Sequence, residues 1–189
     1  MLILTFAPML RILTIIFLFS ASLASAQPNA DYSSLYSQIN NIVESDTSYI
    51  SSYYSSYGIE LDKVNNPEVY HESFRWLTTP HKMGQSSKFG IDCSGFAKII
   101  YEKAYNIKLL GGSRDIYPKT NRVTPSELKE GDLVFFKVRS QNITHVGVFL
   151  QKRMFVHTSS SSGVMVSSLD DSYWSKYFFA AGRWPDLDK

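Results

Sequence analysis

Apolar residues recur at helical spacing in a first stretch that starts near residue 66. Asn66 can cap a helix, Pro67 suits its first position, and Glu68 favours its positively polarised end. Three apolar side chains then fall on one face: Tyr70, Phe74 and Leu77. Because Pro80 disfavours helical geometry in the residue before it, the helix is expected to end near Thr79.

A second helix is predicted at the next run with helical spacing. Asp92 is a natural N-cap, so Cys93 falls in the first turn. Four apolar positions at i, i+3, i+4 and i+8 define the face toward the core: Phe96, Ile99, Ile100 and Ala104. Gly95 lacks a side chain where another backbone or a substrate has to come close.

The second half of the chain is patterned as strands. After a turn-rich segment at 111–125, apolar stretches of strand length follow one another: 133–138, 145–150, 154–157, 164–167 and 180–184. Between the two predicted helices, residues 80–92 are expected to form a loop. Helices first and strands second predict an α+β domain with a small antiparallel sheet, which we place at residues 66–189.

The first 26 residues are patterned differently. Arg11 is followed by an apolar stretch at 12–18 and then by small residues up to Ala26, which is typical of a secretory signal peptide. The alternative is a membrane anchor, since residues 1–18 are largely apolar. No cysteine stands directly after the cleavage site to carry a lipid, so no stable membrane anchor is expected after cleavage.

Residues 27–65 are rich in tyrosine and serine, most densely at 30–58. Four apolar residues at helical spacing allow a short amphipathic helix: Leu35, Ile39, Ile42 and Val43. The alternative is a poorly ordered N-terminal linker. Exposed tyrosines in this segment could stack on sugars, although tyrosines also simply pack.

Composition narrows the classes of function. The 189 residues hold 19 Lys and Arg against 17 Asp and Glu, a formal net charge of +2. A chain so close to neutral is not expected to bind nucleic acid or to dock electrostatically on a membrane. The sequence has no zinc-type spacing of Cys and His, so neither a metal nor another cofactor is expected.

The single cysteine is the main candidate for chemistry. In an exported chain a lone cysteine cannot form an internal disulfide, so it is either a reactive thiol or a buried inert one. At a helix N-terminus, Cys93 is expected to have a lowered pKa and backbone N–H groups ready to hold an oxyanion. Ser94 is a conceivable nucleophile, but it lacks the G-x-S-x-G context of a nucleophile elbow.

Two histidines follow at strand-like positions. His145 opens one predicted strand and His157 closes the next. If these strands form a hairpin centred on residue 151, the histidines lie directly opposite each other, with Cβ atoms roughly 4.5 to 5.5 Å apart. One imidazole could then orient the other, as in a nucleophile–base–orienter array. A turn placed one residue away would change this register.

Four sequence blocks carry a resemblance to a known family. They occur in order with compatible spacing: Asp92-Cys93-Ser94-Gly95-Phe96, Glu130-Gly131-Asp132-Leu133-Val134-Phe135-Phe136, His145-Val146-Gly147-Val148 and Phe155-Val156-His157. Together they resemble the signature blocks of the NlpC-type papain-like cysteine peptidases, which cut cell-wall peptides. The resemblance covers about residues 74–184. It implies a circularly permuted papain-like fold, with the cysteine helix packed on a small antiparallel sheet.

The resemblance also implies a role for each candidate residue. Cys93 would be the nucleophile, His145 the general base, and His157 the residue that orients the base. Three residues would lie at the oxyanion or substrate site: His81, Asp92 and Ser94. His81 stands where the family usually has a tyrosine, and activity is expected to fall below about pH 6 as His81 and His145 become cationic.

The function implied by the resemblance is hydrolysis of peptidoglycan stem peptides by a periplasmic or secreted cysteine peptidase. The favoured bond is the D,D cross-link between neighbouring stem peptides. The alternative is the bond between D-Glu and the diamino acid. A non-catalytic cell-wall binding protein that keeps the fold is the third possibility, although it would not need to retain Cys93, His145 and His157 together.

Overall fold

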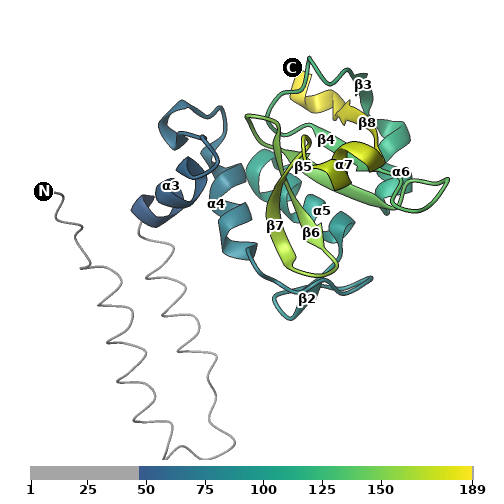
Figure 1. Ribbon diagram of the computed structural model, residues 1–189, viewed down its shortest axis with the longest axis horizontal. Coiled ribbons are helices and arrows are strands. Elements are labelled where there is room, and N and C mark those ends of the chain that lie inside the picture. The colour runs from purple at the N-terminus through teal and green to yellow at the C-terminus, as the bar shows by residue number, and fades with distance from the viewer. Residues whose placement is uncertain (1–46, 189) are drawn as a thin grey trace, which may run out of the picture. The chain divides into compact units, whose positions relative to one another are not determined.

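The computed structural model describes residues 47–188 (Figure 1). The expected signal peptide at 1–26 and the apolar residues 35–43 lie outside the described residues. The described α-helices are α3 (Thr47–Ser55), α4 (Pro67–Trp76), α5 (Cys93–Tyr105), α6 (Ser113–Ile116) and α7 (Ser172–Tyr177), with 3₁₀ turns at Leu61–Lys63, Tyr117–Lys119 and Pro185–Asp188. The described strands are β1 (Ser86–Ser87), β2 (Gly90–Ile91), β3 (Asn121–Val123), β4 (Leu133–Phe136), β5 (His145–Phe149), β6 (Met154–Ser159), β7 (Gly163–Ser168) and β8 (Phe178–Arg183).

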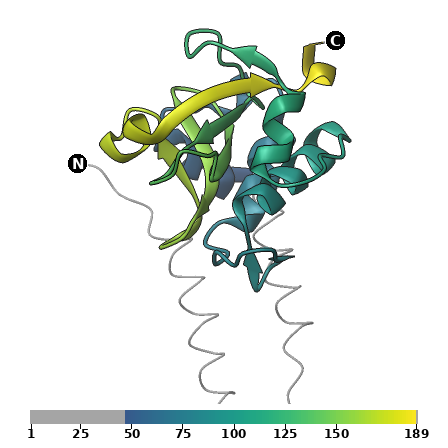
Figure 2. The ribbon, with the colours of Figure 1, turned by 90° about the vertical axis from the view of Figure 1, so that its right-hand side faces the viewer.

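Six strands form one antiparallel sheet in the order β3-β8-β4-β5-β6-β7. Helix α5 packs across β5 and β6. In Figure 2 the teal helices stand on one side of the sheet and the yellow helix α7 lies on the other. This arrangement confirms the predicted α+β class with an antiparallel sheet. It also sets the two histidine-bearing strands against the helix that begins at Cys93.

Both faces of the sheet are buried, and β4 shows why. Its four residues are all buried because alternate side chains enter different cores. Leu133 and Phe135 belong to the larger core, which also holds the buried residues of α4 and α5. Val134 and Phe136 belong to a smaller core that packs against α7. His145 pairs with Phe136, so its side chain shares the face of the smaller core.

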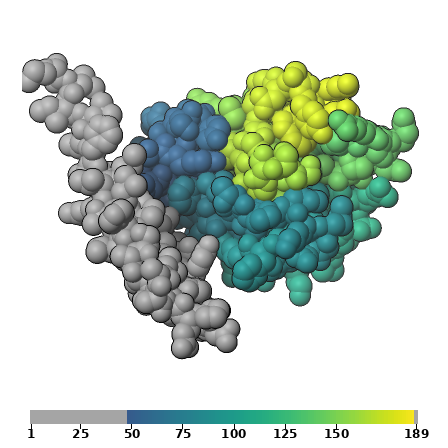
Figure 3. Space-filling view, turned by 60° about the horizontal axis from the view of Figure 1, so that its bottom comes forward, coloured from purple at the N-terminus to yellow at the C-terminus, as the bar shows by residue number. Residues whose placement is uncertain are grey.

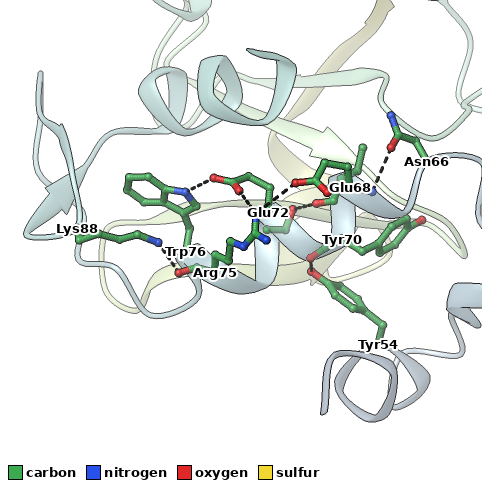
Figure 4. Close-up of polar contacts among 10 residues, drawn as sticks. Tyr54, Asn66, Glu68, Tyr70, Glu72, Arg75, Trp76 and Lys88 are labelled. Carbon is green, nitrogen blue, oxygen red and sulfur yellow. Dashed lines mark hydrogen bonds and ion pairs between the residues drawn. The ribbon is translucent and has the colours of Figure 1, made fainter. Parts of the chain in front are cut away.

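Helix α3 is part of the packed domain. Tyr54 is fully buried, its ring meets that of Tyr70 edge-on at 5.0 Å, and its hydroxyl donates to the Tyr70 carbonyl at 3.1 Å (Figure 4). In Figure 3 the blue atoms of α3 and the turn after it lie directly against the teal part of the domain. Residues 47–55 of the tyrosine-rich segment therefore form a helix that packs on α4.

Helix α4 begins as predicted and ends slightly early. Asn66 Oδ1 accepts from the N–H of Glu68 at 3.1 Å (Figure 4). The helix ends at Trp76, because Thr78 leaves it to donate its N–H to the carbonyl of Val164 in β7 at 2.8 Å. A buried hydrogen bond stabilises the last turn of α4, in which Trp76 Nε1 donates to Oε1 of buried Glu72 at 2.8 Å.

The hairpin of β5 and β6 is centred on residue 152 rather than on residue 151. Two register pairs define it: Val148 with Val156, and Phe149 with Phe155. Continued along the strands, this register puts Gly147 opposite His157. The prediction that His145 lies directly opposite His157 is therefore wrong. His145 lies two residues before Gly147 in β5, and its side chain is on the same face of the sheet as that of His157.

The turn between these strands accounts for the shift. Lys152 and Arg153 both take left-handed backbone conformations, with φ of 52° and 61°. The N–H of Leu150 donates to the carbonyl of Met154 at 2.9 Å, so three residues form the loop. Neither left-handed position is a glycine, and so the sequence carries no sign of where this turn lies.

Several short elements were not predicted from the sequence. Residues 80–92, expected as a loop, contain the β1–β2 hairpin, and β3 pairs with β8 at one edge of the sheet. The strands of this hairpin have two residues each, too few for hydrophobic periodicity to show. Within residues 47–188, no helix combines the length and the apolar character needed to cross a membrane.

Candidate active site

Cys93 is the first residue of α5, and Asp92 caps the helix as predicted. Asp92 Oδ1 accepts from the N–H of Gly95 at 2.7 Å and from the hydroxyl of Ser94 at 2.8 Å. Its other oxygen, Oδ2, accepts from the N–H of Gly84 at 2.8 Å. Asp92 and Ser94 thus tie the preceding turn to the helix start, and they form the framework that holds Cys93.

The expectation of a lowered thiol pKa is wrong. Burial raises the pKa of Cys93, and the negative charge of Asp92 raises it further. The backbone N–H groups of Val146, Ser94 and Cys93 act in the opposite direction without reversing the shift. The residue that caps the helix therefore works against the helix dipole at the sulfur, and Cys93 rests as a neutral thiol.

His145, His157 and Ser167 form one hydrogen-bonded chain. His145 Nε2 lies 3.0 Å from His157 Nδ1, and His157 Nε2 lies 3.0 Å from Ser167 Oγ. The protons in this chain can be arranged in two ways. If each histidine carries its proton on Nε2, then His145 donates to His157, His157 donates to Ser167, and His145 Nδ1 keeps a lone pair. In the reverse arrangement that nitrogen carries the proton and cannot act as a base.

Both histidines are neutral near neutral pH. Burial lowers the pKa of His145 to about 3, and the neighbouring charge of His81 acts in the same direction. Burial also lowers the pKa of His157 well below its ordinary value, with a further contribution from His145. The expectation that His145 becomes cationic below about pH 6 is therefore wrong, because residues distant in the sequence pack around the imidazole and lower its pKa.

Trp174 of α7 covers the histidine pair. Its ring stacks on that of His145, with centroids 5.2 Å apart and planes 23° apart, and meets the ring of His157 edge-on at 4.5 Å. The rings of Phe136 and Phe155, which belong to the smaller core, contact the Trp174 ring with centroid distances of 4.8 and 5.3 Å. His157 is fully buried as a result. Trp174 therefore shields the hydrogen bond between the two imidazoles from solvent.

Two clefts meet at His145. The smaller one has a volume of about 460 Å³, and Cys93, Asp92 and Ser94 contribute to its lining. The larger one, of about 810 Å³, runs along the turn between β6 and β7 and along α7. His81, Thr144 and His145 line both clefts, so the two are neighbouring parts of one groove with His145 at the junction.

The structure thus brings five of the six candidate residues to the smaller cleft. They are His81, Asp92, Cys93, Ser94 and His145, whereas His157 lies buried behind His145. Sequence reasoning missed Ser167 and Trp174 as parts of this array. Ser167 stands two residues from Met165, the β7 partner of His157, so correct strand pairing identifies it. Trp174 lies in a helix too short to show a period.

Comparison with known proteins places these features in one family. The sequence profile of the NlpC/P60 family matches residues 78–183. The probable endopeptidase NlpC homolog of Haemophilus influenzae is 36% identical over 115 residues, which covers 61% of this chain and 59% of that protein. The murein DD-endopeptidase MepS/murein LD-carboxypeptidase of Escherichia coli is 36% identical over 108 residues, 57% of each chain. The matches span less than two thirds of the length of either relative.

A solved structure shows the same fold. The crystal structure of an NlpC/P60 family protein from Bacillus cereus superposes with a TM-score of 0.57. The match covers 66% of this chain and 43% of that chain at 22% sequence identity. At this identity the likeness establishes the arrangement of helices and strands, and the site has to be argued from its own residues.

Proposed function

The chain belongs to the NlpC/P60 family of cysteine peptidases, and from this premise we propose that it is an exported peptidoglycan endopeptidase with Cys93 as the nucleophile. The observation that carries the proposal is that Cys93 and His145 line one cleft while Nε2 of His145 is held by His157 at 3.0 Å. The name of the Escherichia coli relative, a murein endopeptidase, supports peptidoglycan as the substrate. The signal-peptide pattern of residues 1–26 supports export to the periplasm or the medium.

The reaction begins with a neutral Cys93 thiol and a neutral His145 imidazole. His145 Nδ1 takes the proton of the Cys93 thiol as the sulfur attacks the scissile carbonyl, so charge separates only while the bond forms. His157 accepts the Nε2–H of His145 and fixes the reactive tautomer. The backbone N–H of Cys93 and a donor near His81 hold the oxyanion at the start of the helix.

The tetrahedral intermediate then divides the substrate. The C–N bond breaks, the proton on His145 Nδ1 moves to the departing nitrogen, and the acyl half remains as a thioester on Cys93. His145 next takes a proton from water, whose oxygen attacks the thioester carbonyl. Cleavage of the C–S bond releases the acid and returns the proton to the sulfur.

The D,D cross-link is the favoured bond. Residues 157–174 resemble the corresponding stretch of MepS, which is itself named a DD-endopeptidase. Digestion of purified sacculi, followed by mass spectrometry of the muropeptides, tests this choice. Conversion of cross-linked dimers to monomers with intact tetrapeptides supports the D,D bond. Monomers shortened to dipeptides reject it in favour of the bond between D-Glu and the diamino acid.

The raised pKa of Cys93 favours one other candidate, a cell-wall binding protein without activity. The sacculus experiment separates the two when it includes Cys93→Ala, which removes the thiol at a helix position that tolerates alanine. An endopeptidase releases muropeptides only with Cys93 present. A binding protein sediments with sacculi equally well in both forms and releases nothing from them.

A further inference from the structure

The two clefts that make up the groove differ in which of the proposed catalytic residues line them. The smaller cleft includes both Cys93 and His145, whereas the described residues that line the larger cleft include His145 but not Cys93. The nucleophile is therefore reached from one side, and the general base of the proposed reaction faces both. This asymmetry determines where the two halves of a cleaved substrate lie.

The proposed function, on which this argument rests, assigns each half to a cleft. The acyl half is bonded to the sulfur of Cys93, so it occupies the smaller cleft with that atom. The amine half receives its proton from His145 as the C–N bond breaks. It therefore departs on the side where His145 is accessible and Cys93 is not, which is the larger cleft.

The lining of the larger cleft suits a fragment with a positive charge. Hydroxyl groups predominate, from Ser159 to Ser162 and at Ser172, and Tyr173 adds an aromatic ring that is 44% exposed. Among the described residues that line it, none is Lys or Arg, and Asp171 is the one carboxylate. An amine freed from a peptide bond is largely protonated at neutral pH.

Asp171 is held in place by the turn before α7. Its Oδ2 accepts from the N–H of Ser168 at 3.1 Å, and its carbonyl accepts from the N–H of Ser175 at 2.8 Å. In the described part of the chain, Oδ1 accepts no hydrogen bond from the protein. We propose that the larger cleft is the subsite for the amine half of the substrate and that Asp171 binds the ammonium group of a diamino acid in that half.

Equilibrium binding to the Cys93→Ala protein tests this subsite without turnover. The probes are a stem tetrapeptide with a free side-chain amine on its diamino acid and the same peptide acetylated at that amine. The free amine is expected to bind about two- to five-fold more tightly, as for an exposed ion pair. Asp171→Asn should abolish this difference while it keeps the acceptor for Ser168.

Two matched variants serve as controls. Asp170→Asn makes the same charge change one residue away, at a side chain that instead pairs with Arg153 at 2.6 Å and does not line the cleft. Arg114→Gln changes the charge of the smaller cleft. Both should keep the preference for the free amine. Thermal melting of all variants checks that α7 stays folded.

The outcomes separate this subsite from the proposed function. If wild-type protein cuts sacculi but Asp171→Asn and Asp170→Asn respond alike to acetylation, the subsite is overturned. Failure of both peptides to bind overturns it as well. If the peptide binds with the expected dependence on Asp171 while sacculi remain intact, the endopeptidase proposal fails and the ammonium site stands.

Discussion

His145 and His157 meet at 3.0 Å between Nε2 and Nδ1, although Gly147 stands opposite His157 across the two strands. The two imidazoles are therefore diagonal neighbours, within reach of each other because the rings are long enough to span the diagonal. Gly147 allows this arrangement. A Cβ at that position would lie 2.6 Å from the ring of Phe155, on which His157 stacks at 4.9 Å.

This geometry predicts unequal effects of mutating the two histidines. His145→Ala should lower kcat by about 10³-fold, because it removes the proposed general base. His157→Gln should lower it by only about 10-fold, because an amide oxygen can still accept the Nε2–H of His145. Steady-state kinetics on a cross-linked muropeptide measures both. Equal losses would contradict a base and an orienting residue with separate roles.

Local chemistry explains what the sequence predicted well. The caps at Asn66 and Asp92 depend on a side chain and the next few backbone N–H groups, so both helix starts were predictable. The hairpin register was not, since it depends on two left-handed residues, Lys152 and Arg153, that are not glycine.

The electrostatics of the site depend on contacts between distant segments. Trp174 reaches His145 from an element 29 positions later in the chain, and its helix is too short to predict. The burial that lowers the pKa of His145 and raises that of Cys93 exists only after such packing. Sequence position alone therefore pointed to five residues that line one cleft, but it gave the wrong direction for the thiol pKa.

Asp92 combines a structural and an electrostatic role that two substitutions can separate. Asp92→Ala should destabilise the fold by about 1–2 kcal/mol, because it removes the cap of α5 and the acceptor for Gly84. Asp92→Asn should keep most of the cap but remove the charge that raises the pKa of Cys93. Urea denaturation measures the first effect.

The second effect is measured by the rate of Cys93 alkylation with iodoacetamide against pH. The midpoint for Asp92→Asn should move to lower pH than in the wild type, since only the thiolate reacts. Lys98→Gln is the control, because it changes a charge elsewhere on α5 and should leave the Asp92 cap intact. An unchanged alkylation midpoint in Asp92→Asn would mean that the carboxylate does not act on the thiol.

The buried histidines also predict how stability depends on pH. Their folded pKa values lie below 6.5, at about 3 for His145, so the unfolded chain binds protons that the folded chain cannot. Above pH 6.5 neither state is protonated at these sites, and their effect is absent. As the pH falls from there toward 3, the free energy of unfolding should decrease by up to about 1.4 kcal/mol per pH unit for each histidine.

Urea denaturation at several pH values between 7 and 4 checks this slope. His157→Gln removes one of the two titrating groups, so its slope should be smaller than that of the wild type whatever its absolute stability. The same slope in both proteins would show that His157 is not kept neutral by the fold.

Trp174 provides the sharpest test of how the site is arranged. Trp174→Ala should expose the imidazoles, raise the pKa of His145 toward its ordinary value and lower kcat by about 10- to 100-fold, because His145, the proposed base, loses the ring that fixes its orientation. Trp174→Phe should restore part of the activity, since a smaller ring can still stack. NMR titration of the histidine ring protons follows the pKa, and steady-state kinetics separates kcat from KM. Trp174 also lines the larger cleft, so a rise in KM with unchanged kcat and unchanged histidine titration would assign it to substrate binding and reject the positioning role.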